Sequence, residues 1–317
     1  MPAPQVDLPA SGRADFGGRP LLASHDLHEN ELFSDAALVE LLDSYPREHL
    51  YALTMGSDPG RTDGNQLALH DGVSGADLLR AVRTGRLWLN ITGVDRADAR
   101  YRTLIDELYV QLVAQATRFA PLERHGTLLI SSPDVLVYYH ADAPASVLWH
   151  IRGRKRLRVY PALDERYVRH ELLEDIFAGV SHEYLPYEPA YDQAAVVYDL
   201  VPGQWATWPQ NAPHQVDNLD SVNVSLVTEH VTRESRRRAQ LYRANRFLRL
   251  RLGLRNLSRR ESGPMAIAKT AFHRLARRAG LDPVQLKQHV ASLRVDPDAP
   301  GGVVALDPGR GVAGVVR

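Results

Sequence analysis

The chain has 317 residues, of which 44% are apolar, so it can bury a full core and is expected to form one main domain with appendages. It contains no cysteine, which excludes disulfides, thiolate metal ligands and a cysteine nucleophile. No basic and apolar leader opens the chain and no apolar run approaches about 18 residues, so the sequence predicts a cytoplasmic protein with no membrane span.

The formal net charge of zero hides an uneven distribution. Residues 231–317 hold 19 basic and 6 acidic side chains, whereas residues 1–230 hold 19 basic and 32 acidic ones. Two explanations follow from this asymmetry. The basic tail can dock on the acidic body, in its own chain or in a homodimer, or it can bind nucleic acid. Docking is the favoured explanation.

The N-terminal part alternates helical and extended patterns. Residues 1–18 are rich in Pro, Ala and Gly and are expected to be loose. In residues 19–124, a helix is predicted after Ser34, a strand over 86–92 and a long amphipathic helix over 98–118. These elements predict an α/β arm that packs on the next part of the chain.

Short strands broken by Gly, Pro and Asp occupy residues 125–230. This pattern suits a double-stranded β-helix, the jelly roll of cupin-like proteins. The fold expected for the whole chain is therefore mainly β with flanking helices.

A His-x-Asp pair follows the apolar, β-branched and aromatic run 135–140. Such a run favours a strand, and side chains two residues apart in a strand share a face. His140 and Asp142 therefore point the same way, about 6.6 Å apart along the chain. Roughly one or two such spacings arise by chance in a chain of this composition, so the neighbouring segments must support the pair.

The next run alternates strictly after Gly153. Its arginines fall on one face, and Lys155, Leu157 and Val159 fall on the apolar face. The chain has 3 lysines and 35 arginines, so its positive surface charge is supplied mainly by arginine. A buried lysine is costly unless an anion meets it, and that anion is either a structural glutamate or the carboxylate of a ligand.

A third candidate ligand, His214, follows a turn, a short strand and a Pro-rich bend. Together with His140 and Asp142 it provides two imidazoles and one carboxylate. On one face of an octahedral ion this set leaves three positions open, the arrangement that suits non-haem Fe(II) oxygenases.

These segments resemble the JmjC-type, cupin-like branch of the Fe(II)/2-oxoglutarate-dependent oxygenases, which includes the asparaginyl hydroxylase that inhibits the hypoxia-inducible factor. The resemblance covers residues 125–230, about a third of the chain. It implies that His140, Asp142 and His214 bind Fe(II). It also implies that Lys155 pairs with the distal carboxylate of 2-oxoglutarate.

The sequence departs from the family pattern at three positions. Relatives carry Thr or Ser where this chain has Val137, and Asn where it has Ser146. The upstream Tyr that helps to hold the distal carboxylate aligns with Trp88, whose indole N–H can donate one hydrogen bond and accept none. By this alignment Ser146 and Trp88 join Lys155 as cofactor-binding positions.

The resemblance implies an oxygenase that uses O₂ to hydroxylate a C–H bond of a peptidyl side chain or of a small molecule. Two alternatives stay open. Val137, Ser146 and Trp88 favour a cupin metalloenzyme that does not use 2-oxoglutarate. The basic tail favours a ligand-sensing regulator, not an enzyme, that binds nucleic acid.

The tail itself is predicted to be a basic helical extension over residues 231–295, followed by a disordered segment over 296–317. Leu241, Phe247 and Leu248 recur with Leu252 near helical spacing. We therefore expect these four side chains to be buried, against the body or between two copies of the chain.

Overall fold

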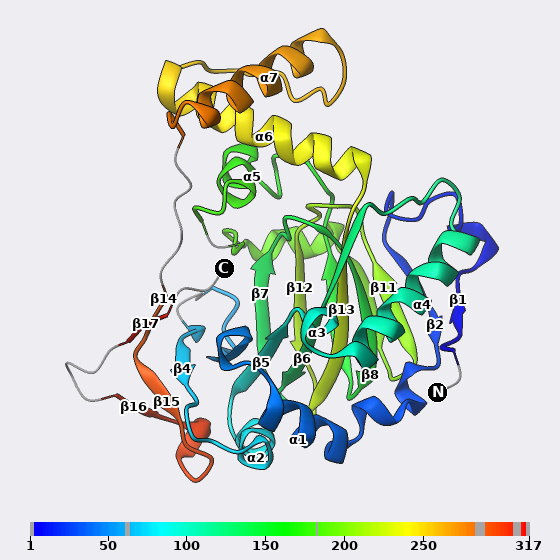
Figure 1. The fold of residues 1–317 in the computed structure, drawn as a ribbon, viewed down its shortest axis with the longest axis vertical. Coiled ribbons are helices and arrows are strands. Elements are labelled where there is room, and N and C mark those ends of the chain that lie inside the picture. Colours follow the sequence, from blue (N-terminus) through cyan, green and yellow to red (C-terminus); the bar gives the residue numbers. More distant parts are fainter. Residues whose placement is uncertain (1–2, 61–63, 182, 283–288, 307–311, 315–317) are drawn as a thin grey trace.

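The computed structural model of the protein describes residues 3–60, 64–181, 183–282, 289–306 and 312–314 (Figure 1). Its helices are α1 (Asp35–Ser44), α2 (Gly75–Thr84), α3 (Val94–Ala97), α4 (Ala99–Gln115), α5 (His170–Phe177), α6 (Arg233–Leu252) and α7 (Pro264–Arg278). Its strands in the first half are β1 (Val6–Asp7), β2 (Leu21–His25), β3 (Leu50–Thr54), β4 (Leu67–Leu69), β5 (Leu87–Thr92), β6 (Glu123–Ser131), β7 (Leu136–His140) and β8 (Ala145–Arg152). The later strands are β9 (Lys155–Val159), β10 (Val196–Leu200), β11 (Gln204–Thr207), β12 (His214–Asn218), β13 (Asn223–Val231), β14 (His289–Ala291), β15 (Leu293–Val295), β16 (Val303–Ala305) and β17 (Val312–Gly314).

Two sheets face each other across a shared core. The long sheet has the order β1-β2-β11-β8-β13-β6-β5-β3-β4-β15-β16, and the second sheet has the order β10-β9-β12-β7. One apolar cluster joins Leu148 and Ala206 of the long sheet to Leu157, Val159 and Val216 of the second sheet. The fold is therefore mainly β with flanking helices, as the sequence predicts.

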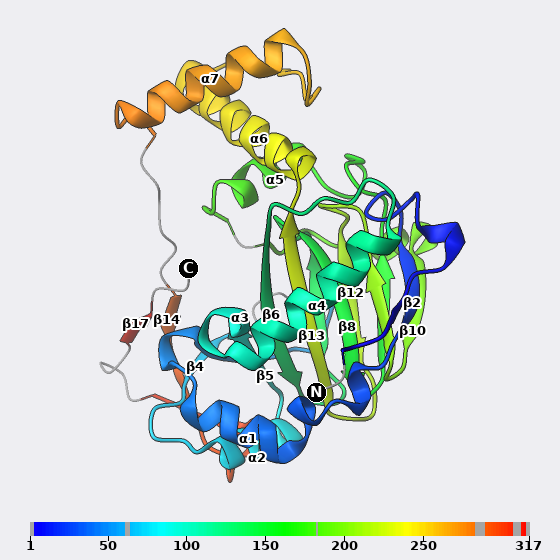
Figure 2. The same cartoon turned by 45° about the vertical axis from the view of Figure 1, so that its right-hand side comes forward.

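The other face of the long sheet is covered by the N-terminal helices. Leu104, Leu108 and Leu112 of α4 are buried in one cluster with Trp149 and Leu226 of the sheet. Because these leucines recur at helical spacing, one face of α4 is apolar and packs on the strands (Figure 2). This arm leaves the opposite face of the long sheet to form the interior between the two sheets.

The N-terminal residues differ from expectation. Residues 3–18, which the sequence predicts to be loose, contain β1, and β1 pairs with β2. The backbone N–H groups of Val6 and Leu8 each donate a 2.9 Å hydrogen bond to a glutamine side chain of α4. These partners lie more than a hundred residues away in the chain. A strand of two residues held by such distant partners has no local sequence pattern that predicts it.

The C-terminal residues differ as well. The sequence predicts a helical extension to residue 295 and disorder from 296, whereas β15 joins the long sheet beside β4, and β16 pairs with β15. The carbonyl of Gly301 accepts a 3.1 Å hydrogen bond from the N–H of Arg86. Sheet pairing thus orders a segment whose composition alone resembles a disordered tail. Residues 307–311 and 315–317 of the predicted tail lie outside the described residues.

Helices α6 and α7 form the extension beyond one end of the sheets (Figures 1 and 2). Leu241, Phe247 and Leu248 are buried there, as predicted. Leu252 is 54% exposed, and that prediction is wrong, because this residue ends α6 directly before the left-handed cap at Gly253.

Part of the basic charge of this extension is neutralised within the chain. Arg246 pairs with Asp175 at 2.7 Å, and Arg249 pairs with Glu174 at 2.8 Å. Both acids belong to α5, so α6 docks on the body through these pairs. The homodimer stays a prediction. No helix in the described ranges is long and apolar enough to cross a membrane.

Candidate metal centre and its inner pocket

Neighbouring strands bring two histidines together. His140 ends β7, His214 begins β12, and the two residues are directly paired in the antiparallel ladder. Their ring centroids lie 4.0 Å apart. The Nδ1 atom of His140 lies 2.6 Å from the carbonyl of Tyr138, and that of His214 lies 3.1 Å from the carbonyl of Ala212. Because a carbonyl only accepts, each Nδ1 carries the proton and each Nε2 is free to bind a metal.

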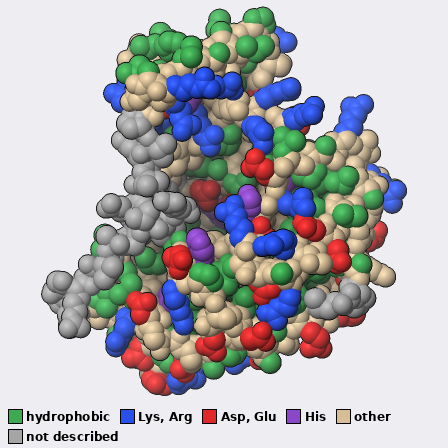
Figure 3. All heavy atoms as spheres, viewed as in Figure 1, with side chains coloured by type: hydrophobic (Ala, Val, Ile, Leu, Met, Phe, Trp, Pro, Cys, Tyr) green, Lys and Arg blue, Asp and Glu red, His purple; other side chains and the backbone are tan. Residues whose placement is uncertain are grey.

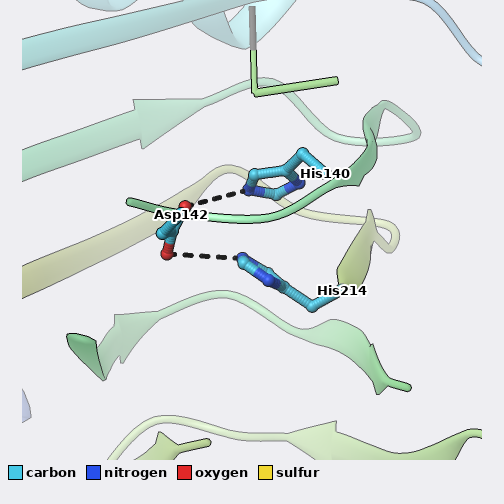
Figure 4. A group of neighbouring side chains, drawn as sticks. All are labelled: His140, Asp142 and His214. Atoms are coloured by element: carbon cyan, nitrogen blue, oxygen red, sulfur yellow. Dashed lines mark ion pairs between the residues drawn. The ribbon is translucent and has the colours of Figure 1, made fainter. Parts of the chain in front are cut away.

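Asp142 completes the group from the loop after β7 (Figure 4). Its two carboxylate oxygens lie 3.6 Å from Nε2 of His140 and 3.6 Å from Nε2 of His214. One ligand atom from each residue fits within 4.8 Å of the others. Ligands about 2.1 Å from a shared ion lie about 3 Å apart when adjacent, so small adjustments suffice to bind one ion.

The loop that carries Asp142 is held by polar side chains. Ser146 donates a 3.0 Å hydrogen bond to the Asp142 carboxylate, and Asn211 donates a 2.8 Å bond to the Asp142 carbonyl. Such partners orient a metal-binding carboxylate. The sequence places Ser146 among the cofactor-binding positions, and the structure places its hydroxyl on the carboxylate of the metal group.

The surroundings of His214 keep its imidazole neutral. Burial, together with the adjacent His140, lowers the pKa of His214 to about 4. His214 is therefore neutral near pH 7, and a neutral imidazole is the form that binds a metal.

Lys155 points into the space between the sheets, as the alternation predicts. It is 5% exposed and shares its face of β9 with the buried Leu157 and Val159. Its Nζ donates to the Ser225 hydroxyl at 2.9 Å. Within the described part of the chain no carboxylate lies within 4.0 Å of this ammonium, so the structural Lys–Glu pair is not present there. Burial lowers the pKa of Lys155 to about 7.

His150 is linked to this unpaired cation through the Ser225 hydroxyl. His150 on β8 places Nε2 2.9 Å from the carbonyl of Gly153 and Nδ1 3.2 Å from the Ser225 hydroxyl. The carbonyl assigns the proton to Nε2, so Nδ1 accepts from Ser225, and Ser225 in turn accepts from Lys155. Burial and the charge of Lys155 lower the pKa of His150 to about 3. The neutral His150 leaves the lysine charge uncompensated.

Trp88 lies on the same inner face of the long sheet as Ser225, but two strands further along the sheet. Ser225 of β13 is paired with Leu129 of β6, which is paired with Asn90 of β5, and Trp88 is two residues from Asn90. Leu87, on the alternate face of β5, is buried in the core under the helices. Trp88 makes no hydrogen bond with any described residue, whereas a buried oxygen of Asn90 is unpartnered.

Sequence reasoning missed three residues of this interior: Ser225, Asn90 and Glu229. Glu229 shares the inner face of β13 with Ser225 and is paired with Ser146 across the ladder. Burial and the charge of Asp142 raise the pKa of Glu229 to about 7. The alternation within β13 could have indicated its face, but not its closeness to the metal group, which depends on the ladder with β8.

Comparison with family models found no match, and no curated protein matches the chain in sequence. Among solved structures, the X-ray structure of YcfD from Escherichia coli matches over 86% of this chain and 68% of that chain, with 15% sequence identity and a TM-score of 0.50. At this identity the likeness to YcfD is one of fold. The resemblance that the sequence predicts is thus confirmed at the level of the fold.

Two further structures of the E. coli protein are similar. One is described as the ribosomal oxygenase YcfD, with 13% identity, coverage of 93% of this chain and 75% of that chain, and a TM-score of 0.48. The other is YcfD in complex with cobalt and 2-oxoglutarate, with 14% identity, coverage of 92% and 75%, and a TM-score of 0.48.

Proposed function

We propose that this chain is an Fe(II)- and 2-oxoglutarate-dependent oxygenase that hydroxylates a C–H bond of a peptidyl side chain or of a small molecule. The observation that carries the proposal is a buried ammonium without a carboxylate partner, inside the same pair of sheets as a His, Asp and His group. We also assign the two packed sheets to a double-stranded β-helix.

The donor set fits a divalent iron. Two neutral imidazoles and a carboxylate bind from one side, and three positions stay open for a chelating 2-oxo acid and O₂. When bound, iron with 2-oxoglutarate and O₂ supplies the oxidising power for C–H hydroxylation and releases succinate and CO₂. Ser146 and Asn211 hold Asp142 in place for this ion.

Lys155 fits the distal carboxylate of the oxo acid. Its ammonium has three donors, one of which binds Ser225, and the two others have no partner among the described residues. Ion pairing there would offset the cost of burying the cation. The side-chain amide of Asn90 lies on the same inner face, so we propose that its N–H₂ group and Lys155, not the family Tyr and Thr, bind this carboxylate.

The test is an anaerobic titration of the purified protein with Fe(II) and 2-oxoglutarate. We expect a weak visible charge-transfer band that needs both components, and succinate after O₂ is admitted. The variant Lys155→Met should weaken the response to 2-oxoglutarate. Arg156→Met is its matched control, because Arg156 lies on the same strand but faces outward toward Asp199. Metal binding without any response to 2-oxoglutarate would favour a cupin metalloenzyme that does not use the oxo acid.

A further inference from the structure

A cleft lies between the helical extension and the body. It has a volume of about 680 Å³, and its walls include Ile176, Phe177, Arg243, Arg246, Leu250 and Arg277. A second hollow of about 370 Å³ shares Arg243 and Arg277 with it and adds Arg274 and Arg278. Figure 3 shows basic side chains gathered on this face along α6 and below α7.

Two sets of arginines on the extension have different partners. Those that face α5, Arg246 and Arg249, are neutralised by its acids. Five others, on or near the walls of the two hollows, have no carboxylate within 4.0 Å among the residues that the structure describes: Arg243, Arg251, Arg274, Arg277 and Arg278. Among the described residues of these walls, Asp282 is the one acid, and it pairs with His273 at 2.7 Å.

Two of these cations, Arg243 and Arg277, line both hollows. Burial and the charge of Arg277 lower the pKa of Arg243. The Nε of Arg243 donates to the carbonyl of Phe177 at 2.6 Å, which directs the guanidinium along the wall of the cleft. Like charges held together in this way raise the affinity of a groove for anions, because an anion between them removes their repulsion.

We propose that this cleft binds the phosphodiester backbone of a single-stranded nucleic acid. Such a strand carries one negative charge per nucleotide, which suits five cations spread over α6, α7 and two adjoining hollows. Leu250, which is 53% exposed, adds an apolar side chain to the wall that an unstacked base can contact, and single strands expose the faces of their bases.

The cleft also reaches the loop that carries Asp142. Ala143, which lines it, directly follows the ligand Asp142. A strand bound along α6 would therefore pass beside the loop that carries this ligand. The inference concerns binding alone and holds independently of the oxidation proposed above.

The experiment measures fluorescence anisotropy of a labelled single-stranded RNA of about 12 nucleotides with the full chain at several salt concentrations. We expect log affinity to fall with log salt with a slope of about −0.7 per phosphate contact. The double variant Arg243→Gln and Arg277→Gln should weaken binding at least about tenfold and make the slope shallower by about 1.4.

The matched control is the double variant Arg80→Gln and Arg166→Gln, which removes the same charge from exposed positions outside the cleft and should bind as the wild type does. The variant Arg274→Gln and Arg278→Gln changes only exposed side chains of α7 and serves if the first variant fails to fold. Wild-type RNA affinity in both cleft variants, or no RNA binding by the wild type at low salt, would overturn the proposal. Binding of a poly-glutamate peptide in place of RNA would overturn it in favour of an acidic protein partner.

Discussion

Two buried lysines of this chain lie in contrasting surroundings. Lys269 on α7 donates to the Asn245 side chain at 2.7 Å and to the carbonyl of Ser258, so it ties α7 to α6 and to the segment between them. Lys155 on β9 donates to one hydroxyl, that of Ser225. Both side chains are less than 10% exposed, at 7% and 5%. Burial alone therefore does not mark a ligand site; the number of satisfied donors separates a structural lysine from one that can bind an anion.

The largest expected effect is on the metal centre, which lies within the same pair of sheets as Lys155. His140→Ala, Asp142→Ala and His214→Ala should each lower iron affinity more than about 100-fold and abolish turnover, because losing a ligand costs more than losing one of its supporting partners. Asp142→Glu should also impair activity, since it moves the carboxylate by one methylene. Metal analysis and circular dichroism of each variant check this. Wild-type iron affinity in any of the three alanine variants removes that residue from the site.

The two lysines should respond in opposite ways to the same substitution. Lys155→Met should raise the 2-oxoglutarate requirement by about 1.5–3 kcal/mol, roughly 10- to 150-fold, with iron binding unchanged. The free energy of unfolding without 2-oxoglutarate should stay level or increase, because a buried unpaired charge is removed.

Lys269→Met should instead leave the carbonyl of Ser258 and the oxygen of Asn245 without their donor. We expect a loss of about 1–3 kcal/mol in the free energy of unfolding and no change in the 2-oxoglutarate requirement. Urea denaturation and titrations of both variants measure the contrast. Equal destabilisation by both substitutions would show that Lys155 is structural too.

The ion pairs of the extension test the same question of what it costs to leave a buried charge unpaired. Glu174 is 3% exposed, so Arg249→Met should cost about 2 kcal/mol by leaving a buried carboxylate unpaired. The double variant with Glu174→Met should recover most of this loss. Arg236→Met, at an exposed pair with Glu123, is the control and should cost less than about 1 kcal/mol. Denaturant midpoints compare the three, and equal losses would contradict a structural role for the buried pair.

The last expected effect is the dependence on pH. Burial lowers the pKa of Lys155 from its ordinary 10.5 to about 7 in the folded chain, so between these values the unfolded chain holds a proton that the folded chain lacks. Stability of the ligand-free protein should therefore rise with pH from about 7 to 10.5 relative to Lys155→Met, and the penalty should be complete below pH 7.

A carboxylate beside Lys155 favours its charged form, so 2-oxoglutarate binding should take up protons above pH 7. Its affinity should fall by up to about tenfold per pH unit there. Calorimetry in two buffers of different ionisation enthalpy detects this uptake. No uptake at pH 8 would mean that the ligand carboxylate does not contact Lys155.

The sequence by itself determined the strands around the site and the faces of His140 and Lys155, whereas Asp142 lies in the loop after β7. These follow from the two-residue period of a strand, which is a local property. It also indicated that one face of α6 is buried, because the helical spacing of Leu241, Phe247 and Leu248 is local as well. Leu252 has the same spacing but is exposed, because the helix ends at this residue.

Only the tertiary structure decided which side chains meet inside. Ser225 reaches Lys155 from a strand 70 residues away, and Glu229 lies near Asp142 through the register of β13 with β8. The pairing of His140 with His214 and the ordering of β1 and β16 also depend on backbone hydrogen bonds between distant segments. Register between such segments is fixed by the packing of the whole sheet, so no local pattern of residues encodes it.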